Sequence, residues 1–177
     1  MKLPRTIRLD ASDTFVFTRA ASPGEWAVTG SFLFTDVDVA VLPTKERVAF
    51  RSGFLGIDSF GFSTLAVVSE ASEDEAEAAT ALLARRFVER LGAPDVATAL
   101  PAAREEIAFA ASLCDHPAGT LLALQRVMEN GEIRERYRTL TPRGDRPRDS
   151  FRAFDFFETD EEPAEEVDLI ALMKDKP

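Results

Sequence analysis

The clearest hydrophobic pattern in the chain lies between residues 72 and 91, where apolar side chains recur at helical spacing. Ser72 followed by Glu75 forms a capping box, and Gly92 stands just past the last apolar position. Acidic residues gather in the first turns and arginines in the last, which complements the helix dipole. The pattern predicts a helix over 72–91 whose buried stripe is Ala76, Ala79, Leu83, Phe87 and Leu91.

Two further helices are predicted with weaker signals. Pro101 suits a first helical turn because it lacks an amide hydrogen, so a helix is expected over 101–113 with Ile107, Ala110 and Leu113 inward. Thr44 can cap a short helix over 45–52 that Gly53 ends, although a strand fits the same stretch.

Strand patterns occupy the N-terminal part of the chain. Residues 14–34 contain two aromatic and β-branched runs separated by a turn signal at Ser22, Pro23 and Gly24, which predicts an early antiparallel hairpin. Residues 60–69, "FGFSTLAVVS", are predicted to form a strand because the run is short and β-branched.

The sharpest local prediction is a hairpin over residues 120–140. Asn130-Gly131 separates two strand-like runs and is typical of a two-residue type I′ turn. This turn pairs Glu129 with Glu132 and, further along, Arg126 with Glu135. In this register, one face of the hairpin carries the apolar side chains and the Arg126–Glu135 pair. The other face carries Arg134, Arg136 and Arg138. A one-residue slip would exchange the two faces, so the turn decides on which face each arginine lies.

The order of strands, then helices, then strands, without regular alternation, predicts an α+β fold. We expect a single domain over residues 1–157, with a mostly antiparallel sheet covered on one face by two main helices. The run "FRAFDFF" at 151–157 is predicted as a further strand of this sheet. Residues 158–177 are predicted to be an acidic C-terminal tail, with a short helix as the alternative.

The amino-acid composition argues against a nucleic-acid-binding protein and against a membrane protein. The formal net charge of -10 disfavours a nucleic-acid surface, which needs a basic face. A single cysteine, Cys114, cannot close an intramolecular disulfide, and no apolar run is long enough for a signal segment or a membrane span. We therefore expect a cytoplasmic protein that binds neither nucleic acid nor membrane.

Motifs for catalysis or cofactors are weak. The glycines of "RSGFLGIDSFGFST" match neither a phosphate-binding loop nor a dinucleotide fingerprint, so we expect turns that admit phenylalanines to a core. Cys114 and His116 are the candidates for an active site, with a buried thiol and an exposed histidine as the simpler interpretation. No set of carboxylates has a diagnostic metal spacing, so neither a cofactor nor a metal is predicted.

Arg134, Arg136 and Arg138 are the candidates for binding a partner or an anion. They form a row of roughly 13 Å along one strand face, and guanidinium groups hold carboxylate or phosphate in a bidentate fork. Nearby acidic residues or the acidic tail can also neutralise them. We expect a non-catalytic binding or accessory module that engages a protein partner, or a second copy, through this hairpin or the aromatic-acidic C-terminal segment. The alternative is a small enzyme or a small-molecule-binding protein with a pocket near Cys114 and His116.

Two phrases carry a resemblance to a known family: "MKLPRTIRLDASDTFVF" at the start and "KERVAFRSGFLGIDSFGFSTL" further along. The chain resembles an uncharacterised bacterial domain-of-unknown-function family of about this length. The resemblance implies a bacterial, cytoplasmic, single-domain protein, and it brings no activity, cofactor or catalytic residue with it.

Overall fold

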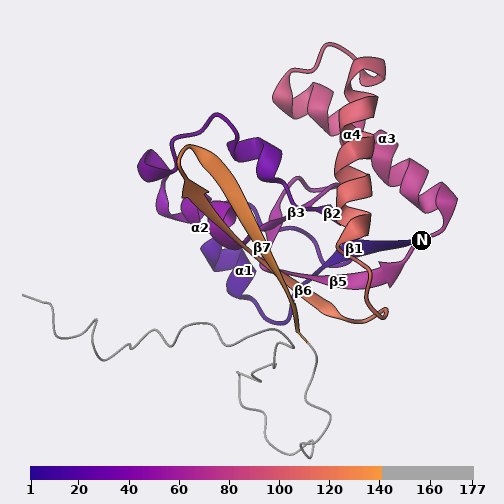
Figure 1. Ribbon diagram of the computed structural model, residues 1–177, viewed down its shortest axis with the longest axis horizontal. Coiled ribbons are helices and arrows are strands. Elements are labelled where there is room, and N and C mark those ends of the chain that lie inside the picture. The colour runs from indigo at the N-terminus through magenta and orange to yellow at the C-terminus, as the bar shows by residue number, and fades with distance from the viewer. Residues whose placement is uncertain (141–177) are drawn as a thin grey trace, which may run out of the picture.

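The computed structural model describes residues 1–140, and Figure 1 shows how their helices and strands are arranged. The predicted strand at 151–157 and the predicted tail at 158–177 lie outside the described residues. Within residues 1–140, no helix is both long enough and apolar enough to span a membrane.

The α+β class with antiparallel sheets is confirmed. The larger sheet has the order β1-β5-β6-β7, so β7 lies at one edge, and its strands are β1 (Lys2–Ile7), β5 (Leu65–Glu70), β6 (Leu121–Glu129) and β7 (Glu132–Leu140). The smaller sheet contains β2 (Ala27–Val28), β3 (Phe54–Gly56) and β4 (Phe62–Ser63). An isolated antiparallel bridge between Arg5 and Trp26 joins the two sheets.

Helices α3 (Glu73–Leu91) and α4 (Val96–Ser112) pack side by side and share one hydrophobic cluster with β1, β2 and β3. The capping box of Ser72 and Glu75 is present, and Gly92 ends α3 at a φ of 75°. The stripe predicted for α3 is buried except at Leu91, which lies in the last turn and is 47 % exposed. The start predicted for α4 at Pro101 is wrong, because the helix begins five residues earlier, at Val96. The Asp95 side chain caps it there by accepting a hydrogen bond from the Thr98 amide.

The early hairpin predicted over residues 14–34 is wrong, although the turn at Gly24 is present. This region contains α1 (Ser12–Val16), β2 and two short 3-10 helices, η1 (Ser31–Phe34) and η2 (Val39–Val41); β2 pairs with β3 instead. Asp13 of α1 accepts hydrogen bonds from Ser63 and Thr64, at 3.3 and 2.6 Å. Contacts with residues fifty positions away have overridden the local strand preference.

The predicted hairpin over 120–140 is confirmed in position and register. Glu129 faces Glu132 across the Asn130-Gly131 turn, and Arg126 faces Glu135. Strand β5 pairs with β6 only as far as Ala123, so the hairpin continues beyond the rest of the sheet. Helix α2 (Thr44–Ser52) packs beside this part of β6, as Figure 1 shows. The prediction of a short helix ended by Gly53 is also confirmed, but the predicted cap at Thr44 is wrong, because Thr44 is the first residue of the helix and no side chain caps its N-terminus.

Candidate functional site

The candidate site lies on the β6–β7 hairpin, and the turn between its strands determines which residues face it. Asn130 and Gly131 have φ angles of 52° and 79°, as a type I′ turn requires. The resulting register places Arg134, Arg136 and Arg138 on one face, where all three are exposed. The sequence prediction of an arginine row is confirmed in its geometry.

Two of these arginines line a pocket of about 380 Å³ together with α2. We call it the arginine pocket; its lining residues are Val48, Arg51, Ser52, Ala123, Leu124, Gln125, Arg136 and Arg138. Arg51 comes from α2, so three guanidinium groups from two separate elements border one hollow. Sequence reasoning missed Arg51 because nothing in its local context indicates that it meets a strand 85 residues later.

The arginines of this face differ in their pairing. Arg134 is paired with Glu129 at 2.7 Å, but both side chains are more than half exposed, so this pair contributes only about 0–1 kcal/mol. Within residues 1–140, Arg51, Arg136 and Arg138 form no ion pair and no side-chain hydrogen bond. The N–H donors of these three guanidinium groups are suited to bind a carboxylate or phosphate ligand.

The opposite side of the hairpin carries Arg126, which is completely buried. Its Nη1 donates to the carbonyl oxygens of Ala49, Phe50 and Gly53, at 3.3, 3.0 and 3.0 Å. These carbonyls lie at the C-terminal end of α2, where a helix has unsatisfied acceptors and favours a cation. Arg126 therefore caps α2 and holds this helix, which carries Arg51, against the hairpin.

Arg126 is also the centre of a charged network. Its Nε donates to Glu135 Oε1 at 2.6 Å, its Nη2 donates to the Thr29 carbonyl, and Tyr137 Oη donates to Glu135 Oε2. Burial lowers the pKa of Arg126, while Glu135 opposes that change. Burial, and then the hydrogen bond to Glu135, raise the pKa of Tyr137. The network therefore keeps Tyr137 neutral and Glu135 paired.

Glu106 of α4 lies beside this network and lines a second pocket of about 420 Å³ with Ser31, Phe32, Thr35 and the hairpin. Its Oε2 atom is buried and has no hydrogen-bond partner within residues 1–140. Burial, and then the charge of Glu135, raise the pKa of Glu106 to about 7. Glu106 therefore takes up a proton near neutral pH, a property that no sequence pattern indicated.

Cys114 and His116 are placed differently from each other. Cys114 is buried, and burial raises the pKa of its thiol to about 11. His116 is exposed, and its backbone carbonyl accepts a hydrogen bond from Lys2 Nζ at 2.8 Å. In the described part of the chain no hydrogen bond joins the two residues, and no group of three His, Cys, Asp or Glu side chains is placed to hold a metal ion.

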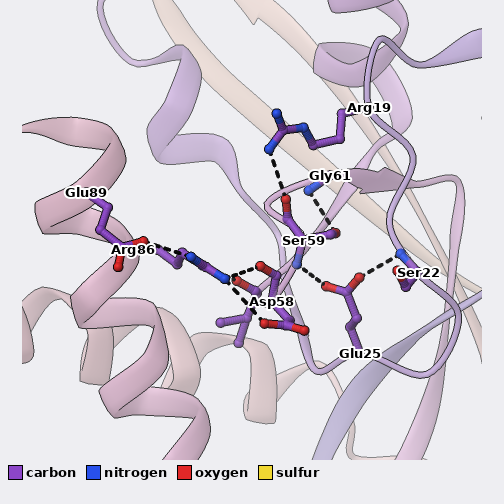
Figure 2. Close-up of polar contacts among 9 residues, drawn as sticks. Arg19, Ser22, Glu25, Asp58, Ser59, Gly61, Arg86 and Glu89 are labelled. Atoms are coloured by element: carbon purple, nitrogen blue, oxygen red, sulfur yellow. Dashed lines mark hydrogen bonds and ion pairs between the residues drawn. The ribbon is translucent and has the colours of Figure 1, made fainter.

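The glycine-containing loop is held by the protein's own side chains, as Figure 2 shows. The carboxylate of Glu25 accepts hydrogen bonds from the amides of Ser22 and Ser59, at 2.6 and 2.8 Å. Arg86 donates to the Asp58 carbonyl and pairs with Glu89. A carboxylate of the chain therefore occupies amides that an anion-binding loop would offer to its ligand.

A model of a family of unknown function, DUF6505, matches residues 1–151. The chain belongs to this family. No curated protein and no solved structure matches the chain. The resemblance found in the sequence is thus confirmed at the level of the family.

The DUF6505 region contains the whole arginine pocket, from Val48 to Arg138, and also Arg126 and Glu106. It ends before the acidic stretch at 158–166. The arginine row and the acidic stretch, two features of opposite charge, therefore fall on different sides of the family boundary.

Proposed function

We propose that this chain is a binding module that holds an acidic segment of a protein partner in the arginine pocket. One observation carries the proposal: Arg51, Arg136 and Arg138 border a single hollow, and none of them has an acidic partner within residues 1–140. Like charges gathered in this way repel one another, and a carboxylate placed between them relieves the repulsion while receiving bidentate hydrogen bonds.

The surroundings of the pocket fit a peptide better than a free anion. Val48, Ala123 and Leu124 supply apolar area beside the charges, and Ser52 and Gln125 supply further polar groups. Such mixed linings are typical of sites that bind a side chain together with its neighbours. The net charge of -10 works against a long polyanion such as nucleic acid, because the rest of the surface repels it.

A second copy of the chain is a less suitable partner for this edge of the sheet. If two β7 strands paired antiparallel around a two-fold axis normal to the sheet, each even-numbered residue would face an even-numbered residue of the other copy. With the axis beside Arg136, this residue would face its own copy and Arg134 would face Arg138, which destabilises the pairing. The arginine row thus disfavours edge-to-edge self-association and favours an acidic partner.

The experiment titrates the full chain into a fluorescein-labelled hexaglutamate peptide and follows fluorescence anisotropy. A hexaglutamine peptide is the control for charge. We expect the variant Arg51→Gln/Arg136→Gln/Arg138→Gln to bind at least about tenfold more weakly, which corresponds to about 1.4 kcal/mol. Binding should also weaken between about 0.02 and 0.15 M salt.

The matched control is Arg85→Gln/Arg90→Gln/Arg104→Gln, which removes three exposed arginines from α3 and α4 and none from the pocket. It should leave the affinity within about twofold. Equal binding by the wild-type chain and the triple variant, or equal binding of both peptides, would refute the proposal.

A further inference from the structure

The residues beyond the DUF6505 region have a charge pattern that matches the arginine pocket. Between residues 155 and 168 the chain has no lysine or arginine and eight acidic residues: Asp155, Glu158, Asp160, Glu161, Glu162, Glu165, Glu166 and Asp168. The arginine pocket is the cationic hollow described above. The same chain therefore contains both a site for carboxylates and a concentrated source of them.

The spacing of the acidic residues also matches the arginine row. Arg136 and Arg138 lie two residues apart on one strand face, a separation of about 6.6 Å. Glu158, Asp160 and Glu162 follow one another at the same interval in the sequence. In any extended peptide, residues at this interval point to one side, so these carboxylates can meet successive guanidinium groups.

The chain is long enough to bring the two features together. Strand β7 ends at Leu140, two residues after Arg138, and the 17 residues 141–157 separate it from Glu158. A connection of that length spans up to about 55 Å, several times the roughly 13 Å length of the arginine row. The return of residues 158–162 to the hairpin requires no change in the described fold.

We propose that residues 158–162 of this chain bind its own arginine pocket and compete there with the acidic segment of the partner. The inference rests on the proposed function, because both ligands use the same three arginines. A segment tethered by a short linker has an effective concentration of about 1 mM. If its intrinsic dissociation constant is about 0.1 mM, the partner's apparent affinity falls about tenfold.

The test compares two full-length variants that lose the same number of charges. Glu158→Gln/Asp160→Asn/Glu162→Gln removes the three carboxylates that share the arginine spacing. Asp155→Asn/Glu161→Gln/Glu165→Gln removes three acidic side chains at odd-numbered positions. We expect the first variant to bind the labelled hexaglutamate peptide about tenfold more tightly than the wild-type chain, and the second to change by less than about threefold.

A second measurement needs no peptide. The backbone amide NMR signals of Arg136 and Arg138 should move in the first variant and stay in place in the second. In the wild-type chain these signals should be independent of protein concentration. A change on dilution would overturn the intramolecular contact in favour of exchange between copies.

The outcomes separate the inference from the proposed function. Equal peptide affinities and equal amide signals for the two variants, with binding that still depends on Arg51, Arg136 and Arg138, would overturn only the intramolecular contact. Peptide binding that is indifferent to these arginines in the wild-type chain and in both tail variants would refute the proposed function. Arginine-dependent binding by the wild-type chain that becomes about tenfold tighter in the first variant alone supports both.

Discussion

Replacing Arg126 by methionine is expected to destabilise the fold strongly. The guanidinium group is completely buried and donates to the carboxylate of Glu135 and to four backbone carbonyls, three of them at the end of α2. Methionine has a similar length but cannot donate. The substitution therefore leaves a carboxylate that is only 13 % exposed without its cation, and α2 without its cap.

The expected decrease in the free energy of unfolding follows from the loss of this buried ion pair. Removing one partner of a buried ion pair costs about 3–5 kcal/mol, a large share of the roughly 5–15 kcal/mol that stabilises a typical domain. At about 2–4 °C per kcal/mol, the melting temperature should fall by roughly 10 °C. Urea unfolding followed by far-UV circular dichroism measures the change, and Arg134→Gln, which breaks only an exposed pair, should lose less than about 1 kcal/mol.

A double variant separates the free energy lost by leaving the Glu135 carboxylate unpaired from the free energy lost with the other contacts of Arg126. Arg126→Met/Glu135→Gln removes the uncompensated carboxylate, so it should be more stable than Arg126→Met alone by about 1–2 kcal/mol. If Arg126→Met proves too unstable to purify, Arg126→Lys keeps a charge without the fork and should lie between it and the wild type. A loss of unfolding free energy below about 1 kcal/mol in Arg126→Met, or no gain in the double variant, would contradict the role of Arg126 as partner of Glu135 and cap of α2.

Three further predictions concern other residues. The raised pKa of Glu106, about 7, lies above its value in the unfolded chain, so the stability it contributes is present at acidic pH and is lost as the pH rises through 7. The urea midpoint of Glu106→Gln should therefore rise relative to the wild type between about pH 5 and pH 8, and parallel curves would contradict this. Because burial raises the pKa of Cys114 to about 11, a thiol reagent should react slowly with the native chain and rapidly in urea; fast native labelling would show an accessible thiolate. A side chain at Gly61 would place Cβ 2.7 Å from the Ala20 carbonyl, so Gly61→Ala should cost about 1–3 kcal/mol in urea unfolding, and an unchanged midpoint would disprove this close approach.

Local signals predicted the parts of the fold that local contacts stabilise. Helix α3 is capped by Ser72 with Glu75 at its start and by Gly92 just past its end, so its caps are local to the helix. The hairpin is specified by two turn residues between its two strands. The arginine row followed directly from that turn, since strand side chains alternate between faces. By contrast, Phe17 packs against Phe62 with ring centroids 5.9 Å apart, and this long-range contact belongs to a helix-ending segment that its composition predicted as a strand.

The amino-acid sequence was sufficient to predict the α+β class, the long helix α3 and the two-faced hairpin, because each depends on periodicity, caps or a turn within a few residues. Long-range packing brings Arg51 to the same pocket as Arg136 and Arg138, places Arg126 at the end of α2, and places Glu106 beside Glu135. These juxtapositions join residues far apart in the chain, and burial is the largest cause of the shifted pKa values of Arg126 and Glu106. Desolvation and convergence of charge arise from packing, which no short stretch of sequence encodes.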